Sequence, residues 1–183
     1  NNFLLPFFYA SIFIAVIVAL FSKEFVMLFF SNKYQDAIPV IAILSIYYAS
    51  LFFGKVTGAQ LICAKKTFSI TLITLLGIGT NFVLNIPFII YFGIIGAAWA
   101  TTLSGVILAF VSFYFAQKYA KIKWQWKPIL SIYSLFLVFS AFSLFEYSFS
   151  IGLLKSLILK SLFVFVYIFV EYLLGFFNLK KIN

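Results

Sequence analysis

Residues 94–116 read IIGAAWATTLSGVILAFVSFYFA and contain no charged side chain. As a helix this run is about 35 Å long, which is enough to cross a bilayer core of about 30 Å. The run also lacks the polar face that a helix needs on the surface of a soluble protein. It therefore indicates a helix that spans a membrane.

The rest of the chain repeats this pattern, with short lysine-bearing stretches between long apolar runs. Hydrophobic residues make up 65% of the 183 residues and charged residues 9%, and the mean hydropathy of +1.16 lies outside the range of soluble proteins. No connector is long enough to fold into a domain outside the membrane. The sequence predicts an all-α integral membrane protein, a single transmembrane helical domain of about six spans, at residues 3–21, 37–62, 68–92, 94–116, 129–145 and 156–177.

Two boundaries stay open at this level. The apolar part of KEFVMLFFSNKYQDA, residues 23–37, is too short to span, so we expect it to lie at the membrane interface. Asp36 is a suitable N-cap for the second span. That span either stops near Gly54 or continues as one long helix to Ala64.

The lysines predict an orientation. Six spans place their connectors alternately on the two sides of the membrane, and one side then receives eight lysines while the other receives Lys23, Lys33 and Lys155. Because positively charged connectors are retained in the cytoplasm, we expect both ends of this chain to be cytoplasmic. The eight lysines are Lys65, Lys66, Lys118, Lys121, Lys123, Lys127, Lys180 and Lys181.

Several classes of function are not supported by the residues. The formal charge is +9, but no basic cluster has the density of a nucleic-acid surface, so no nucleic-acid partner is expected. With one cysteine, Cys63, and no histidine, neither a disulfide framework nor a metal site is expected. The carboxylates show no acid–base spacing and there is no glycine-rich phosphate loop, so we expect neither an enzyme nor a cofactor. These carboxylates are Glu24, Asp36, Glu146 and Glu171.

Polar residues inside the spans are the remaining candidates for function, because lipid makes them costly unless they face a cavity or a partner. If the second helix stops near Gly54, Lys55 is an interfacial lysine whose ammonium reaches the headgroups. If the helix continues to Ala64, Lys55 must point into the bundle and becomes a candidate cavity residue. Gly54 and Gly58 have the GxxxG spacing that is typical of close helix packing.

Two further pairs stand out. Asn81 and Asn85 are spaced i, i+4 on one face of the third span, where they either hydrogen-bond a neighbouring helix or line a polar cavity. Lys160 and Glu171 share a face of the last span but lie about 16 Å apart, too far for a direct ion pair. We interpret Lys160 as interfacial, and Glu171 as either paired with another helix or a candidate coupling carboxylate.

The order of these pieces resembles a known family. The segment NFVLNIPFIIYFGIIGAAWATTLSG, residues 81–105, is similar to the N-x-x-L-N … P … G-I-x-G-A-A-x-A-T segment of polysaccharide (O-antigen-type) flippases in the multidrug/oligosaccharidyl-lipid/polysaccharide exporter superfamily. The resemblance covers roughly residues 3–124, and the last two spans match only as apolar helices. The matching residues are Asn81, Leu84, Asn85, Pro87, Gly93, Ile94, Gly96, Ala97, Ala98, Ala100 and Thr101.

The resemblance implies transport across a bacterial inner membrane. Such flippases have twelve to fourteen helices in two lobes, so this chain, which begins with Asn1, looks like the second lobe of a longer protein. They move polyprenyl-pyrophosphate-linked oligosaccharides for lipopolysaccharide and other surface polysaccharides. Expected partners are this lipid, the bilayer, a coupling cation (H⁺ or Na⁺), and glycan polymerase and chain-length proteins. The family layout also favours Lys55 as a cavity residue that meets the pyrophosphate.

Two alternatives to flipping remain open. The first is a cation-coupled antiporter of drugs or metabolites in the same superfamily, with Glu171 as its coupling carboxylate. The second is a membrane subunit that transports nothing and serves as a scaffold for partner proteins.

Overall fold

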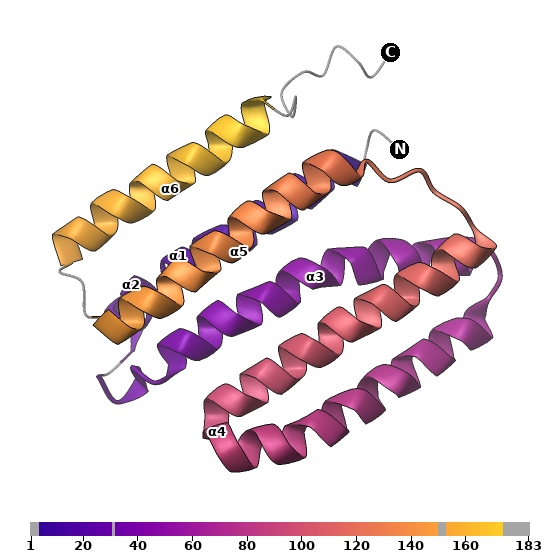
Figure 1. Ribbon diagram of the computed structural model, residues 1–183, viewed down its shortest axis with the longest axis horizontal. Helices are drawn as coiled ribbons and strands as arrows, with labels where there is room; N and C mark the ends of the chain where they lie inside the picture. The colour runs from indigo at the N-terminus through magenta and orange to yellow at the C-terminus, as the bar shows by residue number, and fades with distance from the viewer. Residues whose placement is uncertain (1–3, 31, 150–152, 174–183) are drawn as a thin grey trace. The chain divides into compact units, whose positions relative to one another are not determined.

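The computed structural model describes residues 4–30, 32–149 and 153–173, and all regular elements within these ranges are helices (Figure 1). The all-α architecture predicted from the sequence is confirmed. Four of the described helices are long and apolar enough to cross a membrane. A fifth crossing is added if α1 (Leu4–Leu20) and α2 (Ser22–Phe29), which meet at an angle of 61°, are counted together as one broken span.

Helix α4 (Thr67–Tyr119) is a hairpin of two spans. Its 53 residues would measure about 80 Å if straight, far more than a bilayer core. The helix turns back at Gly93, whose φ of 58° and ψ of −136° belong to a region that glycine enters most easily. A Cβ atom at Gly96 would collide with the carbonyl oxygen of Phe88, so the turn needs a second glycine. Figure 1 shows the two arms lying side by side, with the break at the predicted junction of the third and fourth spans.

The other helices match the expected runs with shifted ends. Helix α3 (Ala37–Cys63) is unbroken and begins directly after Asp36, which decides in favour of the longer alternative. Helix α5 (Trp126–Phe149) begins three residues before the predicted start, because Pro128 fits in the first turn, where its missing N–H is not needed. Helix α6 (Leu153–Leu173) begins before the predicted residue 156, and residues 174–177 of that prediction lie outside the described residues.

The chain divides into two compact units, where the sequence suggested a single domain. Unit 1 comprises residues 1–45 and 124–183, and unit 2 comprises residues 46–123. Helix α3 contributes its first part to unit 1 and its remainder to unit 2. The sequence does not reveal this division, because runs that are apolar on every side do not show which neighbour each helix packs against.

In unit 1, α1 packs along α5, and α6 packs against α5 and α1. The ring of Phe163 on α6 stacks on Phe139 and meets Phe142 edge-on, with both centroid distances at 4.8 Å. The short helix α2 and the single 3₁₀ turn η1 (Asn32–Tyr34) connect α1 to α3. The fully buried apolar side chains of α1 and α5 form the centre of this unit: Ile12, Val16, Leu20, Ile132 and Phe136.

In unit 2, α3 packs against the α4 hairpin through neutral polar contacts. The hydroxyls of Thr57 and Ser112 lie 2.7 Å apart, and the Gln60 side chain donates a hydrogen bond of 2.6 Å to the carbonyl oxygen of Ala120. A small apolar core of Leu61, Ile73 and Ala116 lies beside these contacts.

Candidate functional site

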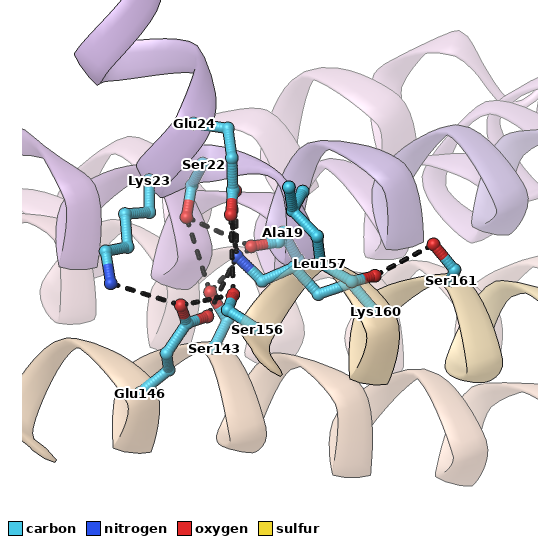
Figure 2. A network of polar contacts seen from close by, with 10 residues as sticks. All are labelled: Ala19, Ser22, Lys23, Glu24, Ser143, Glu146, Ser156, Leu157, Lys160 and Ser161. Atoms are coloured by element: carbon cyan, nitrogen blue, oxygen red, sulfur yellow. Dashed lines mark hydrogen bonds and ion pairs between the residues drawn. The ribbon is translucent and has the colours of Figure 1, made fainter. Parts of the chain in front are cut away.

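A buried ionic network joins three helices of unit 1 (Figure 2). The ammonium of Lys160 on α6 lies 2.7 Å from each carboxylate oxygen of Glu24 on α2 and 2.8 Å from Oε2 of Glu146 on α5. The side chain of Lys160 has no exposed surface, and that of Glu146 is 1% exposed. Lys160 therefore does not extend an exposed ammonium towards the headgroups, as expected from the sequence, but is enclosed within the protein by two carboxylates.

Two more side chains complete the network. Lys23 lies 3.3 Å from Oε1 of Glu146, and the same oxygen accepts a hydrogen bond of 2.6 Å from Ser156, which also lies 3.4 Å from Glu24. The network then contains two ammonium groups and two carboxylates, so its formal charge is zero. This balance matters because removing an unpaired charge from water costs several kcal/mol, of order 5 kcal/mol or more in lipid-like surroundings.

The network surrounds the break between α1 and α2. The carbonyl oxygen of Ala19, in the last turn of α1, accepts hydrogen bonds from Ser22 at 3.0 Å and from Ser143 of α5 at 2.7 Å. The two hydroxyls are themselves 3.3 Å apart. Side chains therefore supply partners to backbone at a helix end, as is required where water is scarce.

The sequence offered only a partial signal for this network. Lys160 stands in an apolar run with no carboxylate three or four residues away on its own helix, so it needs a partner from another helix. Glu24 is 136 residues away along the chain from Lys160. The positions of the four carboxylates in the sequence therefore gave no indication that two of them meet at one lysine. Only the packing of α2, α5 and α6 brings Glu24 and Glu146 to the same ammonium.

Glu171 lies apart from this network, on the α1–α6 interface. Its side chain is buried at 6% exposure, and its Oε1 has no hydrogen-bond partner among the described residues. Tyr167, one helical turn away, donates a hydrogen bond of 3.2 Å to the backbone oxygen of Tyr9 on α1. As expected from the spacing along α6, Lys160 pairs with other carboxylates and not with Glu171.

Asn81 joins the two arms of the α4 hairpin, and Asn85 supports it from the same arm. The amide of Asn81 donates to the hydroxyl of Ser104 at 3.0 Å and contacts that of Thr101 at 3.4 Å, both on the second arm. Asn85 donates to the side-chain oxygen of Asn81 at 2.9 Å. Of the two roles that the sequence left open, these contacts are those of a hydrogen bond between neighbouring helices.

Lys55 lines a groove on unit 2. Because α3 is continuous, Lys55 lies about 12 Å before its end, inside the span. The groove has a volume of about 230 Å³ and is lined by α3 and both arms of α4. Lys55 itself is exposed. The other lining residues with a hydroxyl group are Tyr47, Ser50, Thr74 and Ser112.

The glycine pair on α3 also belongs to this groove. Gly54 and Gly58 both line it, and a Cβ atom at either position would meet nothing within 4 Å. The GxxxG spacing therefore does not mark a close helix contact within unit 2, as its pattern suggested, but an open surface beside Lys55.

Comparison with known proteins supports a membrane location. The chain is similar to a protein of Methanocaldococcus jannaschii described as an uncharacterised membrane protein, with 31% identity over 170 residues. The match covers 93% of this chain and 33% of the relative, so the chain spans about a third of the length of the curated relative it matches. No family model matches the chain, and no solved structure matches it. Together with the apolar helices, this similarity supports an all-α membrane protein.

Proposed function

We propose that this chain is part of a transporter that moves a polyprenyl-pyrophosphate-linked oligosaccharide across the membrane for surface polysaccharide biosynthesis. The observation that carries the proposal is the position of Lys55 in the groove of unit 2, inside a membrane span. An ionisable side chain at such a depth is costly and is typically kept for a ligand or an ion pathway. The resemblance of residues 81–105 to O-antigen-type flippases suggests which ligand this is.

The chemistry of the groove suits a lipid-linked diphosphate. A lysine ammonium offers a compact positive charge with three donors, which matches phosphate oxygens without requiring one fixed geometry. The hydroxyls of Ser50, Thr74 and Ser112 make the same lining polar, although each is already hydrogen-bonded within unit 2, so Lys55 carries the recognition of the diphosphate. Apolar residues that line the groove, such as Leu51 and Leu108, provide a surface for a hydrocarbon chain beside the headgroup.

The proposed orientation places this cation on the loading side. With both chain ends in the cytoplasm of a bacterial cell, the end of α3 near Lys65 and Lys66 is cytoplasmic. Lys55 then lies in the cytoplasmic half of the inner membrane, where lipid-linked glycans are assembled. Asn81 holds together the two arms that form the far side of the groove, and Asn85 orients Asn81, so both are positioning residues. A glycan polymerase and chain-length proteins would act on the exported product.

The test uses the full-length protein in liposomes that contain a polyprenyl pyrophosphate carrying one fluorescent sugar. We expect Lys55→Gln to weaken the apparent affinity for this lipid about tenfold, as for loss of a charged hydrogen bond worth about 1.5 kcal/mol. Lys55→Arg retains most transport, and Lys121→Gln, which removes an exposed lysine of the connector, serves as the matched control. Equal transport by Lys55→Gln and Lys121→Gln overturns the proposal.

A second function is favoured by Glu171. Its buried Oε1, which has no partner within the part of the chain that the structure describes, is a candidate for binding a coupling H⁺ or Na⁺, as in a cation-coupled antiporter of drugs or metabolites. In that case Glu171→Gln abolishes ethidium efflux driven by a cation gradient, while transport of the fluorescent lipid is unchanged. The third alternative is a scaffold subunit. It predicts that Lys55→Ala and Asn85→Leu leave both export of surface polysaccharide and cation-driven efflux unchanged.

A further inference from the structure

The short helix α2 has two different faces. Ser22 and Val26, one turn apart, are buried against unit 1, at 1% and 2% exposure. Phe25, Leu28 and Phe29 follow the i, i+3, i+4 spacing of a single face and are 51%, 78% and 70% exposed. A helix that is covered on one side and presents large apolar side chains on the other needs an apolar partner for its open face.

The direction of α2 suggests that its apolar partner is lipid near one surface of the membrane. Helix α1 is about 25 Å long and accounts for most of a bilayer core. Because α2 departs from it by 61°, its eight residues advance only about 6 Å along the α1 direction. Ile14 and Val18 of α1 are also exposed apolar residues, so we expect both helices to contact lipid, with α2 near one surface of the membrane.

The rings on this face end in polar groups. Phe25 lies 5.0 Å from Phe29 and 6.0 Å from Phe30, between ring centroids, and Phe30 lies 5.9 Å from Tyr34. The ammonium of Lys33 stands 5.3 Å from the centre of the Tyr34 ring. A series of apolar rings that ends in a phenol and an ammonium fits the boundary between acyl chains and phosphate headgroups.

The ionic network holds α2 at this angle. Lys23 and Glu24 both belong to α2, and they bind Glu146 of α5 and Lys160 of α6. We propose that α2 is a membrane-interface anchor whose partner is the lipid headgroup–acyl boundary, and that the network sets its angle. The proposal does not depend on the transported substrate.

Depth measurements test the location of α2. In the full-length protein with its other cysteines, including Cys63, replaced by serine, Leu28→Cys carries an environment-sensitive fluorophore in phosphatidylcholine vesicles. We expect nitroxides at the lipid headgroup and the upper part of the acyl chain to quench this fluorophore several-fold more than nitroxides near the terminal methyl groups of the acyl chains. Ile14→Cys on the middle of α1, 63% exposed, is the control and should show the opposite order. Stronger quenching of Leu28→Cys by deep nitroxides overturns the proposal, and so does no quenching by either.

A second variant tests the role of the network without an unpaired charge. Glu24→Gln with Lys160→Met removes one cation and one anion and leaves Lys23 beside Glu146. We expect the Leu28 label in this background to shift towards deep quenching, because α2 is no longer tied to α6. An unchanged depth shows that the ion pair between Glu24 and Lys160 does not hold α2 at its angle, and it overturns the assignment of that role to the network.

Discussion

The two units of this protein join their helices by different chemistry. Unit 1 adds ions to its neutral contacts: Lys160 is enclosed by Glu24 and Glu146, with Lys23 as the second cation. Unit 2 uses neutral groups, namely the amide of Asn81, hydroxyls such as Thr57, and the close approach of backbones at Gly96. In lipid the neutral contacts are independent and individually modest, whereas the ions are stable only as a balanced set.

The largest effect is expected when the balance of unit 1 is broken. Lys160→Met leaves two carboxylates facing one lysine, and we expect it to lower the free energy of unfolding by about 3–5 kcal/mol. The measurement is denaturation of the full-length protein in mixed micelles. Lys155→Met, which changes an exposed lysine five residues earlier on α6, is the control and should have little effect. Similar values for the two variants would show that the network does not stabilise unit 1.

Restoring the balance should reverse much of that loss. Glu24→Gln combined with Lys160→Met keeps the formal charge of the remaining pair, Lys23 and Glu146, at zero. We expect the double variant to be more stable than Lys160→Met alone, because no buried carboxylate lacks a cation. A double-mutant cycle in the same micelles measures this coupling. Simple addition of the two single losses would mean that the charges act separately.

In unit 2 the largest expected effect comes from backbone contact, not charge. Gly96→Ala drives a methyl group into the Phe88 carbonyl and should cost about 1–3 kcal/mol by overpacking. Gly79→Ala on the first arm of α4 is the control, since a Cβ atom there meets nothing within 4 Å. The same unfolding assay compares them, and a Gly79 variant as unstable as the Gly96 variant contradicts the hairpin geometry.

The smallest effect is expected at the amide pair. Asn81→Leu removes the hydrogen bond to Ser104 and should cost about 0.6 kcal/mol, the average for such contacts between membrane helices. Asn85→Leu should cost less, because Asn85 donates only to Asn81 on its own arm. Unfolding of both variants decides the order, and the reverse order would place Asn85, not Asn81, at the contact between the arms.

The α4 hairpin shows which structural features can be predicted from local sequence and which cannot. The turn at Gly93 lies where residues 68–92 and 94–116 were expected to meet, because glycine in the only uncharged connector is a local signal. The face shared by Asn81 and Asn85 is likewise fixed by helical spacing. Ser104, the partner of Asn81, lies across the hairpin, which is why the sequence left both a helix contact and a cavity open for the pair.

The amino-acid sequence by itself determined that the chain is helical and membrane-spanning, because length and apolarity are properties of each segment. It also determined where polar groups would be costly, among them Lys55, Lys160 and Glu171. Only the tertiary structure decided that Lys160 is enclosed by Glu24 and Glu146 and that Lys55 lines a groove. The physical reason is that apolar helices offer many equivalent ways to pack, and a charge selects among them only when its counter-ion, far away in the chain, is brought to it.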